Sequence, residues 1–480
     1  MQKLKGLEPE RVFRYFEEIS NIPRGSGNMK GINQYCIDFA KKHKLEYFTD
    51  DTLNVVIFKN ATKGYENADT VMLQGHLDIV CQKTPDSKID FLKDGLDIYV
   101  DGDFITANGT TLGADNGIAI AMILAILERD DICHPNIEAV FTTNEETGMD
   151  GAECLDKTRL KSKKMINIDS EEDDSLTVSC AGGSDIKISL NVDFEDVTKE
   201  LVKVELKGLK GGHSGIEING NRVNANKLLG KVLNNLKDEC EFSIVSVNGG
   251  DKRNAIPNSC VLNAATGNAK EFTTVLETVL NNIKNEIRVN EPSFNWSITN
   301  EGTVTVKALT NNSTEKAIYL LNNVVDGVVK MSEKIDGLVE TSLNLGILTT
   351  EKDKIVLGIM ARSNDDASLE ALEKELVSFS EKAEATIVVS GHYPPWEYKE
   401  NSELQEIYKK LYKEQFLKDV KVEAIHAGLE CGLFSRDMKD LDCISIGPTM
   451  FDVHTVNERL SISSTKAMYK LLITLLQNLK

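Results

Sequence analysis

The chain has 480 residues, of which 41% are hydrophobic and 27% charged, and its formal net charge is -20 at pH 7. This length is well above the size at which single cores stop growing, so we expect two domains. The negative charge argues against nucleic acid as a partner, because binding phosphates requires a basic face.

Membrane and disulfide chemistry are also disfavoured. The chain contains no uninterrupted apolar stretch of the ~18 residues that a membrane helix needs, and its N-terminal stretch has no signal-like apolar core. We therefore expect no membrane partner and a cytoplasmic location. The nine cysteines are odd in number and form no CxxC pair, which argues against a disulfide framework and a thiolate zinc site.

Residues 1–185 alternate helical patterns with short apolar runs, which predicts an α/β domain with a mostly parallel sheet. The predicted strands are Asn54–Phe58, Val71–Leu73, Ile137–Phe141 and Met165–Ile168. Polar sequences follow three of these strands directly, namely QGHLD, TTNEETG and DSEEDD. Sites in open α/β sheets form beyond the carboxyl ends of the strands. We therefore expect functional residues in these three segments.

Residues 186–390 show alternating strands and amphipathic helices, which predicts an inserted α+β domain with an antiparallel sheet. Residues 391–480 begin near the prolines of GHYPPWEYK and contain a helix, Ser402–Phe416, and a strand, CISIGP. That strand leads to a histidine that can complete the site of the first domain. We therefore expect residues 1–185 and 391–480 to form one discontinuous catalytic domain.

His76 and Asp78 lie two residues apart after a predicted strand, so their side chains point to the same face if the extended conformation persists. A carboxylate in that place can orient and polarise a metal-ligating imidazole. Turn residues or hydrogen-bonded caps give the same short motif, and HxD alone does not decide between these readings.

Three further carboxylates stand at buried element ends. Asp115 lies between a glycine-rich turn and a strongly apolar helix, where it could cap the helix or reach the centre of the sheet. Glu145 and Glu146 end the apolar run IEAVFTT, where adjacent carboxylates repel each other unless a cation is near. Because neighbours on a strand point in different directions, one can bind a metal while the other faces substrate. A solvated turn is the alternative.

Asp169 ends a buried strand, and His454 lies in a turn after CISIGP where a hydrogen-bonded loop histidine would also fit. In combination, the candidates make two metal sites, each with one imidazole and one carboxylate, and a shared carboxylate between them: His76, Asp115, Glu146, Asp169 and His454. Nitrogen and oxygen ligands of this kind suit zinc, cobalt or manganese. Two divalent ions would also balance three carboxylates and a hydroxide.

Two metal ions about 3.5–4 Å apart can hold a hydroxide and polarise a carbonyl, which is hydrolytic chemistry. Glu145 then has a role as the catalytic acid/base: it would take a proton from the water and pass it to the leaving amine.

Six ordered motifs, spread over nearly the whole chain, resemble the co-catalytic zinc peptidases that include aminoacylase, carnosinase and peptidase T: LQGHLDIV, TLGADNGIAIA, TTNEETGMDGA, NIDSEE, GLKGGHSG and TMFDVHTVNERL. The resemblance implies two zinc-like ions. One would be bound by His76 and Asp169, the other by Glu146 and His454, with Asp115 bridging them. It also implies that Asp78 orients His76, that Glu145 is the general acid/base, and that the Asp115–Asn116 peptide is cis.

By the same resemblance, the inserted domain is similar to the family's lid and is a place where two chains could pair. His213 in KGGHSG would stabilise the carbonyl oxyanion or contact substrate, although a turn histidine is an alternative. Asn254 and Arg362 match lid positions, and an arginine suits a peptide's terminal carboxylate. His426 either lines the pocket or has a packing role.

The segment AIHAGLECGLF favours the dipeptidase branch over carnosinase. We therefore expect a metallo-dipeptidase that acts on short peptides, and the resemblance implies that Xaa-His dipeptides can be among its substrates. The runner-up is an N-acyl-amino-acid amidohydrolase or a tripeptidase of the same fold. A binding protein that has lost its activity is a third hypothesis, but its signature would be a missing ligand or base, and none is missing.

Overall fold

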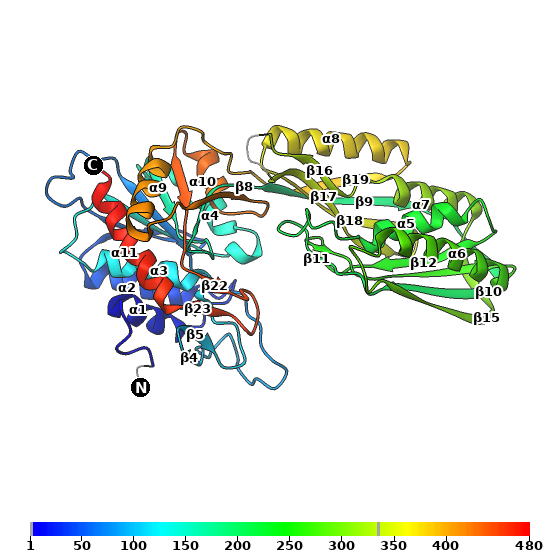
Figure 1. Ribbon diagram of the computed structural model, residues 1–480, viewed down its shortest axis with the longest axis horizontal. Helices are drawn as coiled ribbons and strands as arrows, with labels where there is room; N and C mark the ends of the chain where they lie inside the picture. Colours follow the sequence, from blue (N-terminus) through cyan, green and yellow to red (C-terminus); the bar gives the residue numbers. More distant parts are fainter. Residues whose placement is uncertain (1–2, 334–336) are drawn as a thin grey trace. The chain divides into compact units, whose positions relative to one another are not determined.

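The structure is a computed structural model that describes residues 3–333 and 337–480. The chain folds into two compact units (Figure 1): unit 1 is Met1–Ser179, Trp396–Ala424 and Leu429–Lys480, and unit 2 is Cys180–Pro395 and Ile425–Gly428. Each unit has its own hydrophobic core, and the two cores share no residue. In the described part of the chain, no helix combines the length and apolar character that crossing a membrane requires.

The observed units depart from the predicted division at three places: residues 180–185, residues 391–395 and a short later segment were all expected in the catalytic domain but belong to unit 2. Ile425–Gly428 belongs to unit 2, although it falls inside the range expected for the catalytic domain. Hydrogen bonds explain the difference, because the amide of Ala181 donates to the carbonyls of Ile425 and Ala427 at 3.1 Å each. The chain therefore passes into unit 2 twice.

Unit 1 is an α/β unit with a mixed sheet. Its helices are α1 (Glu10–Ser20), α2 (Lys30–Lys42), α3 (Ala114–Leu127), α4 (Asp150–Cys154), α9 (Glu403–Phe416), α10 (Cys431–Asp437) and α11 (Ile462–Asn478). Its strands are β1 (Glu46–Thr49), β2 (Val55–Lys59), β3 (Val71–His76), β4 (Ile98–Asp101), β5 (Phe104–Ala107), β6 (Ile137–Thr142), β7 (Lys164–Asn167), β8 (Ser175–Cys180), β20 (Lys421–Ile425), β21 (Asp442–Ser445), β22 (Met450–Phe451) and β23 (Arg459–Ser461).

The main sheet of unit 1 has eight strands in the order β1-β2-β6-β3-β7-β21-β8-β20. Its centre, β6-β3-β7-β21, is parallel, whereas β1 and β2 pair antiparallel with their neighbours and β8 pairs antiparallel with β21. The predicted mostly parallel α/β sheet is thus confirmed for the central strands, and β2 is an antiparallel exception. A second sheet, β22-β23-β5-β4, holds the segment before His454.

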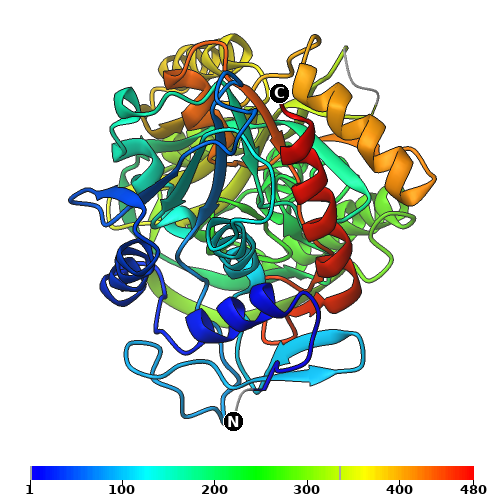
Figure 2. The same ribbon diagram turned by 90° about the vertical axis from the view of Figure 1, so that its left-hand side faces the viewer.

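The central strands and α3 make the core of unit 1. All six residues of β3 and of β6 are buried, as is typical of strands covered on both faces. Helix α3 is apolar all round, and such a helix is stable only when it is enclosed. It packs against β3 and α1. Figure 2 shows α1 in dark blue and α11 in red on the side of unit 1 that faces the viewer.

Unit 2 is an α+β unit, as expected. Its helices are α5 (Ala225–Leu236), α6 (Ala269–Ile287), α7 (Asn311–Asn323) and α8 (Asp366–Lys382). Its strands are β9 (Gly182–Asn191), β10 (Phe194–Lys207), β11 (Gly212–His213), β12 (Ser243–Gly249), β13 (Ala255–Ile256), β14 (Cys260–Thr266), β15 (Asn295–Leu309), β16 (Gly327–Met331), β17 (Val339–Thr350), β18 (Lys354–Ser363) and β19 (Thr386–Tyr393).

The large sheet of unit 2 has nine strands, with the path β15-β10-β14-β12-β17-β18-β9-β19 and with β16 beside β17. Its strand pairs are antiparallel. A separate two-stranded ribbon, β11-β13, carries His213. Strands β17 and β18 place Ser342 opposite Arg362.

Candidate active site

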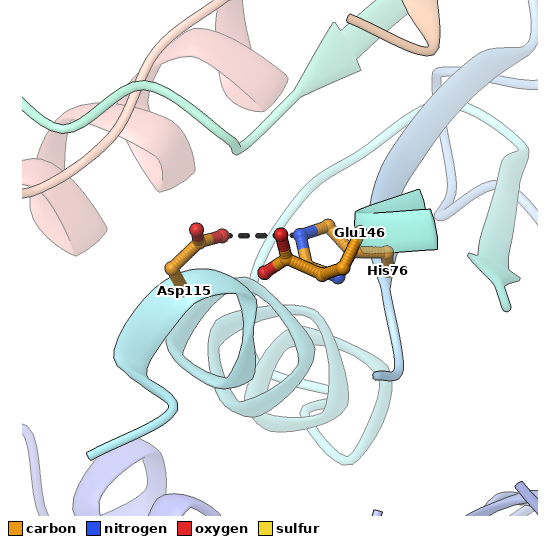
Figure 3. Close-up of side chains that lie close together, drawn as sticks. All are labelled: His76, Asp115 and Glu146. Carbon is orange, nitrogen blue, oxygen red and sulfur yellow. Dashed lines mark hydrogen bonds and ion pairs between the residues drawn. The ribbon is translucent and has the colours of Figure 1, made fainter. Parts of the chain in front are cut away.

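Two histidines and three carboxylates converge beyond the carboxyl ends of the central strands of unit 1. His76 Nε2 lies 3.0 Å from Asp115 Oδ1 and 3.4 Å from Asp169 Oδ1. His454 Nε2 lies 3.0 Å from Asp115 Oδ2 and 3.0 Å from Glu146 Oε2. Asp115 therefore uses one oxygen toward each histidine. Figure 3 shows His76, Asp115 and Glu146 pointing toward one another.

Each of these side chains comes from a different element. His76 is the last residue of β3, and Asp169 follows the end of β7 by two residues. Asp115 lies in the first turn of α3 with an extended backbone (φ -79°, ψ 110°). Glu146 lies in a 3-10 turn, Glu145–Thr147, and His454 lies between β22 and β23 with a φ of 65°.

One local expectation differs from the structure. Strand β6 ends at Thr142, so Glu145 and Glu146 diverge because they occupy a helical turn and not because strand neighbours alternate. The carboxylate of Asp115 contacts the two histidines, which favours the site reading of this residue over the helix-cap reading.

Asp78 connects His76 to the turn of the two glutamates. His76 Nδ1 lies 3.2 Å from the backbone oxygen of Asp78 and 3.5 Å from its carboxylate. Donation from Nδ1 leaves Nε2 as the unprotonated nitrogen, the form that binds a metal. The carboxylate of Asp78 also accepts from Ser26 Oγ at 2.8 Å and from the amides of Glu145 at 3.1 Å and Glu146 at 3.3 Å.

Asn116 joins the ends of β3 and β7 to α3. The Asp115–Asn116 peptide is cis, as the motifs imply. The Asn116 side chain accepts from the amide of His76 at 3.2 Å and donates to the carbonyl of Ile168 at 2.6 Å. Gly75 makes room for it, because a Cβ there would lie 2.4 Å from Asn116 Oδ1.

Sequence reasoning missed two buried residues that hold the Asp115 loop. Arg24 donates to the carbonyls of Leu77 at 3.0 Å and Gly113 at 2.6 Å. Glu458 accepts from the four consecutive amides of residues 112–115 at 2.8–3.3 Å. The only available signal for Arg24 was its place in a glycine- and proline-rich loop, and function often lies in such loops.

The carboxylates of the site lie close enough to change one another's pKa values. Burial raises the pKa of Asp169 to about 6, against the opposing effect of His76. Burial also raises the pKa of Glu145 well above its usual value, with His76 opposing and Asp169 and Glu146 adding to the rise. For Asp115, burial is outweighed by hydrogen bonds from His454 and His76, which lower its pKa. The site therefore favours positive charge near its centre.

These residues fit a divalent metal. One nitrogen or oxygen from each of His76, Asp115 and Glu146 lies within 4.8 Å of the others, so this group can hold a metal ion. Asp169 Oδ1 is buried and has no hydrogen-bond partner in residues 3–333 and 337–480, which is unusual for a carboxylate oxygen. A donor set of imidazole and carboxylate suits zinc, cobalt or manganese.

The structure brings His213 and Asn254 together in unit 2. His213 in β11 pairs with Ala255 in β13, and the carbonyl of Asn254 accepts from the amide of Ser214 at 2.9 Å. His213 Nδ1 accepts from the amides of Gly215 at 3.1 Å and Ile216 at 3.2 Å. A neutral His213 therefore carries its proton on Nε2 and is a hydrogen-bond donor there.

Arg362 and a buried, neutral His426 lie within electrostatic reach of each other in unit 2. His426 Nε2 lies 2.7 Å from Ser342 Oγ, and its Nδ1 lies 3.0 Å from Asn364 Oδ1. Burial, Arg362 and His213 lower the pKa of His426 to about 3. Arg362 donates to the Tyr393 hydroxyl at 2.9 Å, and its buried Nε has no hydrogen-bond partner in the described part of the chain. Both ring nitrogens of His426 are hydrogen-bonded, which favours a supporting role over direct contact with substrate.

The fold and the strand-end residues are those of a metallopeptidase-like α/β protein, and comparison with known proteins identifies the family. The sequence model of Peptidase family M20/M25/M40 matches residues 72–478, and the chain belongs to that family.

Its relatives include dipeptidases. The chain is 37% identical to the cytosol non-specific dipeptidase of Escherichia coli, with 100% of this chain and 99% of the relative covered. It is also similar to the crystal structure of aminoacylhistidine dipeptidase from Vibrio alginolyticus, with 35% identity, a TM-score of 0.89, and 99% and 98% of the two chains covered. The resemblance expected from the motifs is thus confirmed. An aminopeptidase from Bacillus cereus shares the fold, with 15% identity, a TM-score of 0.58, and 98% of each chain covered.

Proposed function

We propose that the chain is a metal-dependent dipeptidase of broad specificity whose substrates include Xaa-His dipeptides. The observation that carries this proposal is the placement of Asp115 between two imidazole nitrogens, each 3.0 Å from a different oxygen of its carboxylate. A bridging carboxylate of this kind suits a pair of ions. Full-length similarity to a relative named cytosol non-specific dipeptidase supports the reaction and the substrate class.

In the proposed centre, His76 and Asp169 hold one ion, Glu146 and His454 hold the other, and Asp115 lies between them. Zinc suits the ligands best, with cobalt and manganese as alternatives. Two such ions would polarise the scissile carbonyl and acidify the attacking water. Asp78 keeps His76 Nε2 directed at the ion through the contacts of Nδ1.

Glu145 is the proposed general acid/base. Its side chain is half-buried, and its backbone amide donates a hydrogen bond to the carboxylate of Asp78 at 3.1 Å. This bond holds the backbone of Glu145 beside the candidate ligands. A pKa above the usual glutamate range suits a group that must both accept and return a proton near neutral pH. It would take the proton from the attacking water and deliver it to the leaving amine.

Unit 2, residues 186–390 in the predicted division, is proposed to act as a lid that recognises the substrate. The Nε2 proton of His213 would be donated to the carbonyl oxygen as negative charge develops there. Arg362 would bind the terminal carboxylate, with its unpartnered Nε as one available donor, while Asn254 binds the peptide and His426 supports Arg362 from the same face. Recognition of the terminal carboxylate by Arg362 would favour short peptides such as dipeptides.

Two finer proposals concern the environment. A cytoplasmic location is supported by the similarity to the cytosol non-specific dipeptidase of Escherichia coli. Pairing with a second copy through unit 2 is supported by strand β19, which lies at one edge of its sheet. Three exposed valines lie on β19 and the neighbouring α8: Val377, Val388 and Val389. Edge strands present unpaired backbone groups that another strand can use.

The test is a substrate panel. Protein stripped of metal and reloaded with zinc, cobalt or manganese is assayed with dipeptides, tripeptides and N-acyl amino acids. We expect hydrolysis of dipeptides, with little activity on the other two classes. Hydrolysis of only N-acyl amino acids would replace this proposal with the amidohydrolase alternative, and a preference for tripeptides would replace it with a tripeptidase.

A further inference from the structure

A buried chain of polar side chains crosses the central strands of unit 1 beneath the candidate metal ligands. It contains Ser445 of β21, Asn167 of β7, Gln74 of β3 and Thr142 of β6, and it ends at Glu430, the residue before α10. Gln74 lies opposite Asn167 in the sheet register, and Asn167 lies opposite Ser445. Each of these five residues is buried. Polar groups in such a core are costly unless they are hydrogen-bonded to one another.

In this network of buried polar side chains, each hydrogen bond has its donor on the side of Ser445 or Thr142 and its acceptor on the side of Glu430. Ser445 Oγ donates to Asn167 Oδ1 at 2.5 Å, and Asn167 Nδ2 donates to Gln74 Oε1 at 2.5 Å. Gln74 Nε2 then donates to Glu430 Oε2 at 2.5 Å. Thr142 Oγ1 donates to the same oxygen at 2.6 Å. Glu430 Oε2 is therefore the acceptor on which the chain ends.

Glu430 determines which atoms of the neighbouring side chains donate and which accept. Asn and Gln side chains carry a donor and an acceptor at similar positions, so neither Asn167 nor Gln74 selects its own orientation. Glu430 Oε1 is buried without a hydrogen-bond partner among the residues described. A proton on the carboxyl group would sit on Oε1, and Oε2 would remain an acceptor in either charge state. The order of donors and acceptors in the network therefore does not depend on the ionisation of Glu430.

This network of buried polar side chains lies next to the strand ends that carry the candidate ligands. Gln74 precedes His76 by two residues on β3, and Asn167 precedes Asp169 by two residues. Residues two apart on a strand point to the same face. A change in the orientation of the Gln74 side chain would therefore alter the surroundings of His76 on the same face of β3, while Asn167 is the last residue of β7 and Asp169 follows it by two residues.

We propose that Glu430 is a positioning residue for the metal centre: as the final acceptor of this buried chain, it fixes the side-chain orientations beneath His76 and Asp169. The inference rests on the proposed metal centre. Partners of this outer kind typically change metal affinity by about 10- to 100-fold when they are removed.

The test compares the metal affinity of four proteins: wild type, Glu430→Gln, Glu430→Leu and Ser445→Ala. Affinity for zinc is measured by competition with a fluorescent chelator, and thermal unfolding is recorded beside it. Glu430→Gln keeps an acceptor oxygen but removes the charge, whereas Glu430→Leu removes the acceptor. Ser445→Ala removes the donor at the far end and leaves the acceptor in place. If Glu430→Leu does not fold, Gln74→Met takes its place, because it cuts the chain while retaining side-chain length.

We expect Glu430→Leu to weaken zinc binding by about 10- to 100-fold, with Glu430→Gln and Ser445→Ala each remaining within about threefold of wild type. Unchanged affinity in folded Glu430→Leu, or in Gln74→Met if that variant is used, would overturn the inference. An equal loss in Glu430→Gln would overturn it too, because charge and not the acceptor would then be responsible. Failure of the wild-type protein to bind zinc would instead overturn the proposed metal centre.

Discussion

The two units concentrate opposite charges. Unit 1 gathers the carboxylates of Asp115, Glu146 and Asp169 around two imidazoles, so its site favours cations. Unit 2 instead offers the positive charge of Arg362 near a neutral His426, so that place favours anions. The comparison suggests a division of labour in which unit 1 performs hydrolysis and unit 2 selects substrates by their terminal carboxylate.

The substitution with the largest expected effect is Asp115→Asn, in the carboxylate-rich site of unit 1. Because this carboxylate contacts both histidines, its loss should weaken both proposed ion sites at once. We expect both ions to bind more weakly, and activity to fall by more than the ~10⁴-fold upper range for loss of a general base. Elemental analysis after gel filtration reports the metal content, with Asp101→Asn on β4 as the matched control. Retention of two ions by Asp115→Asn would contradict the bridging role.

Glu145→Ala separates catalysis from metal binding within unit 1. Glu145 is assigned to proton transfer and not to ion binding, so kcat should fall by about 10²- to 10⁴-fold while the metal content stays unchanged. Steady-state kinetics and elemental analysis on the same sample measure both quantities. Full activity would show that another group is the base, and loss of metal would make Glu145 a ligand.

Arg362→Ala tests the basic side of the comparison. Loss of a charged hydrogen bond to the terminal carboxylate should lower kcat/KM for dipeptides by about 10- to 150-fold. The same substitution should leave the already slow hydrolysis of a dipeptide amide nearly unchanged, because that substrate lacks the carboxylate. Arg288→Ala, an exposed arginine of unit 2, is the matched control. An equal loss on both substrates would contradict carboxylate recognition.

The smallest effect concerns the stability of unit 2 in acid. Burial, Arg362 and His213 lower the pKa of His426 to about 3 from the usual histidine value of 6.5. Between these values the unfolded chain binds a proton that the folded chain does not. The free energy of unfolding therefore falls as the pH drops below about 6.5, by about 2 kcal/mol at about pH 5.

His426→Gln should lose this pH dependence. Urea unfolding at about pH 8 and about pH 5 measures the difference, and a Trp396→Phe background restricts the fluorescence to Trp296 in unit 2. The same pH dependence with and without His426 would show that this histidine is not the buried base that the structure describes.

Sequence patterns were sufficient for the central strands, because apolar runs bounded by polar segments mark them. The same patterns predicted the candidate ligands that the structure brings together, since acidic or histidine-containing segments follow the strand ends. They did not predict the 3-10 turn that contains Glu145 and Glu146. The backbone amides of these residues donate to Asp78, which belongs to a distant segment. Arg24 and Glu458 were not assigned site roles for the same reason. Their partners are backbone groups that lie far away in sequence and have no local pattern.

The central claim, a two-ion centre that hydrolyses dipeptides, is tested most directly by titrating metal-free protein with zinc while dipeptide hydrolysis and bound metal are measured on the same samples. We predict that the metal-free protein is inactive and that activity saturates as the second ion per chain binds. Full activity without metal, or saturation with a single ion and no further binding, would contradict the claim.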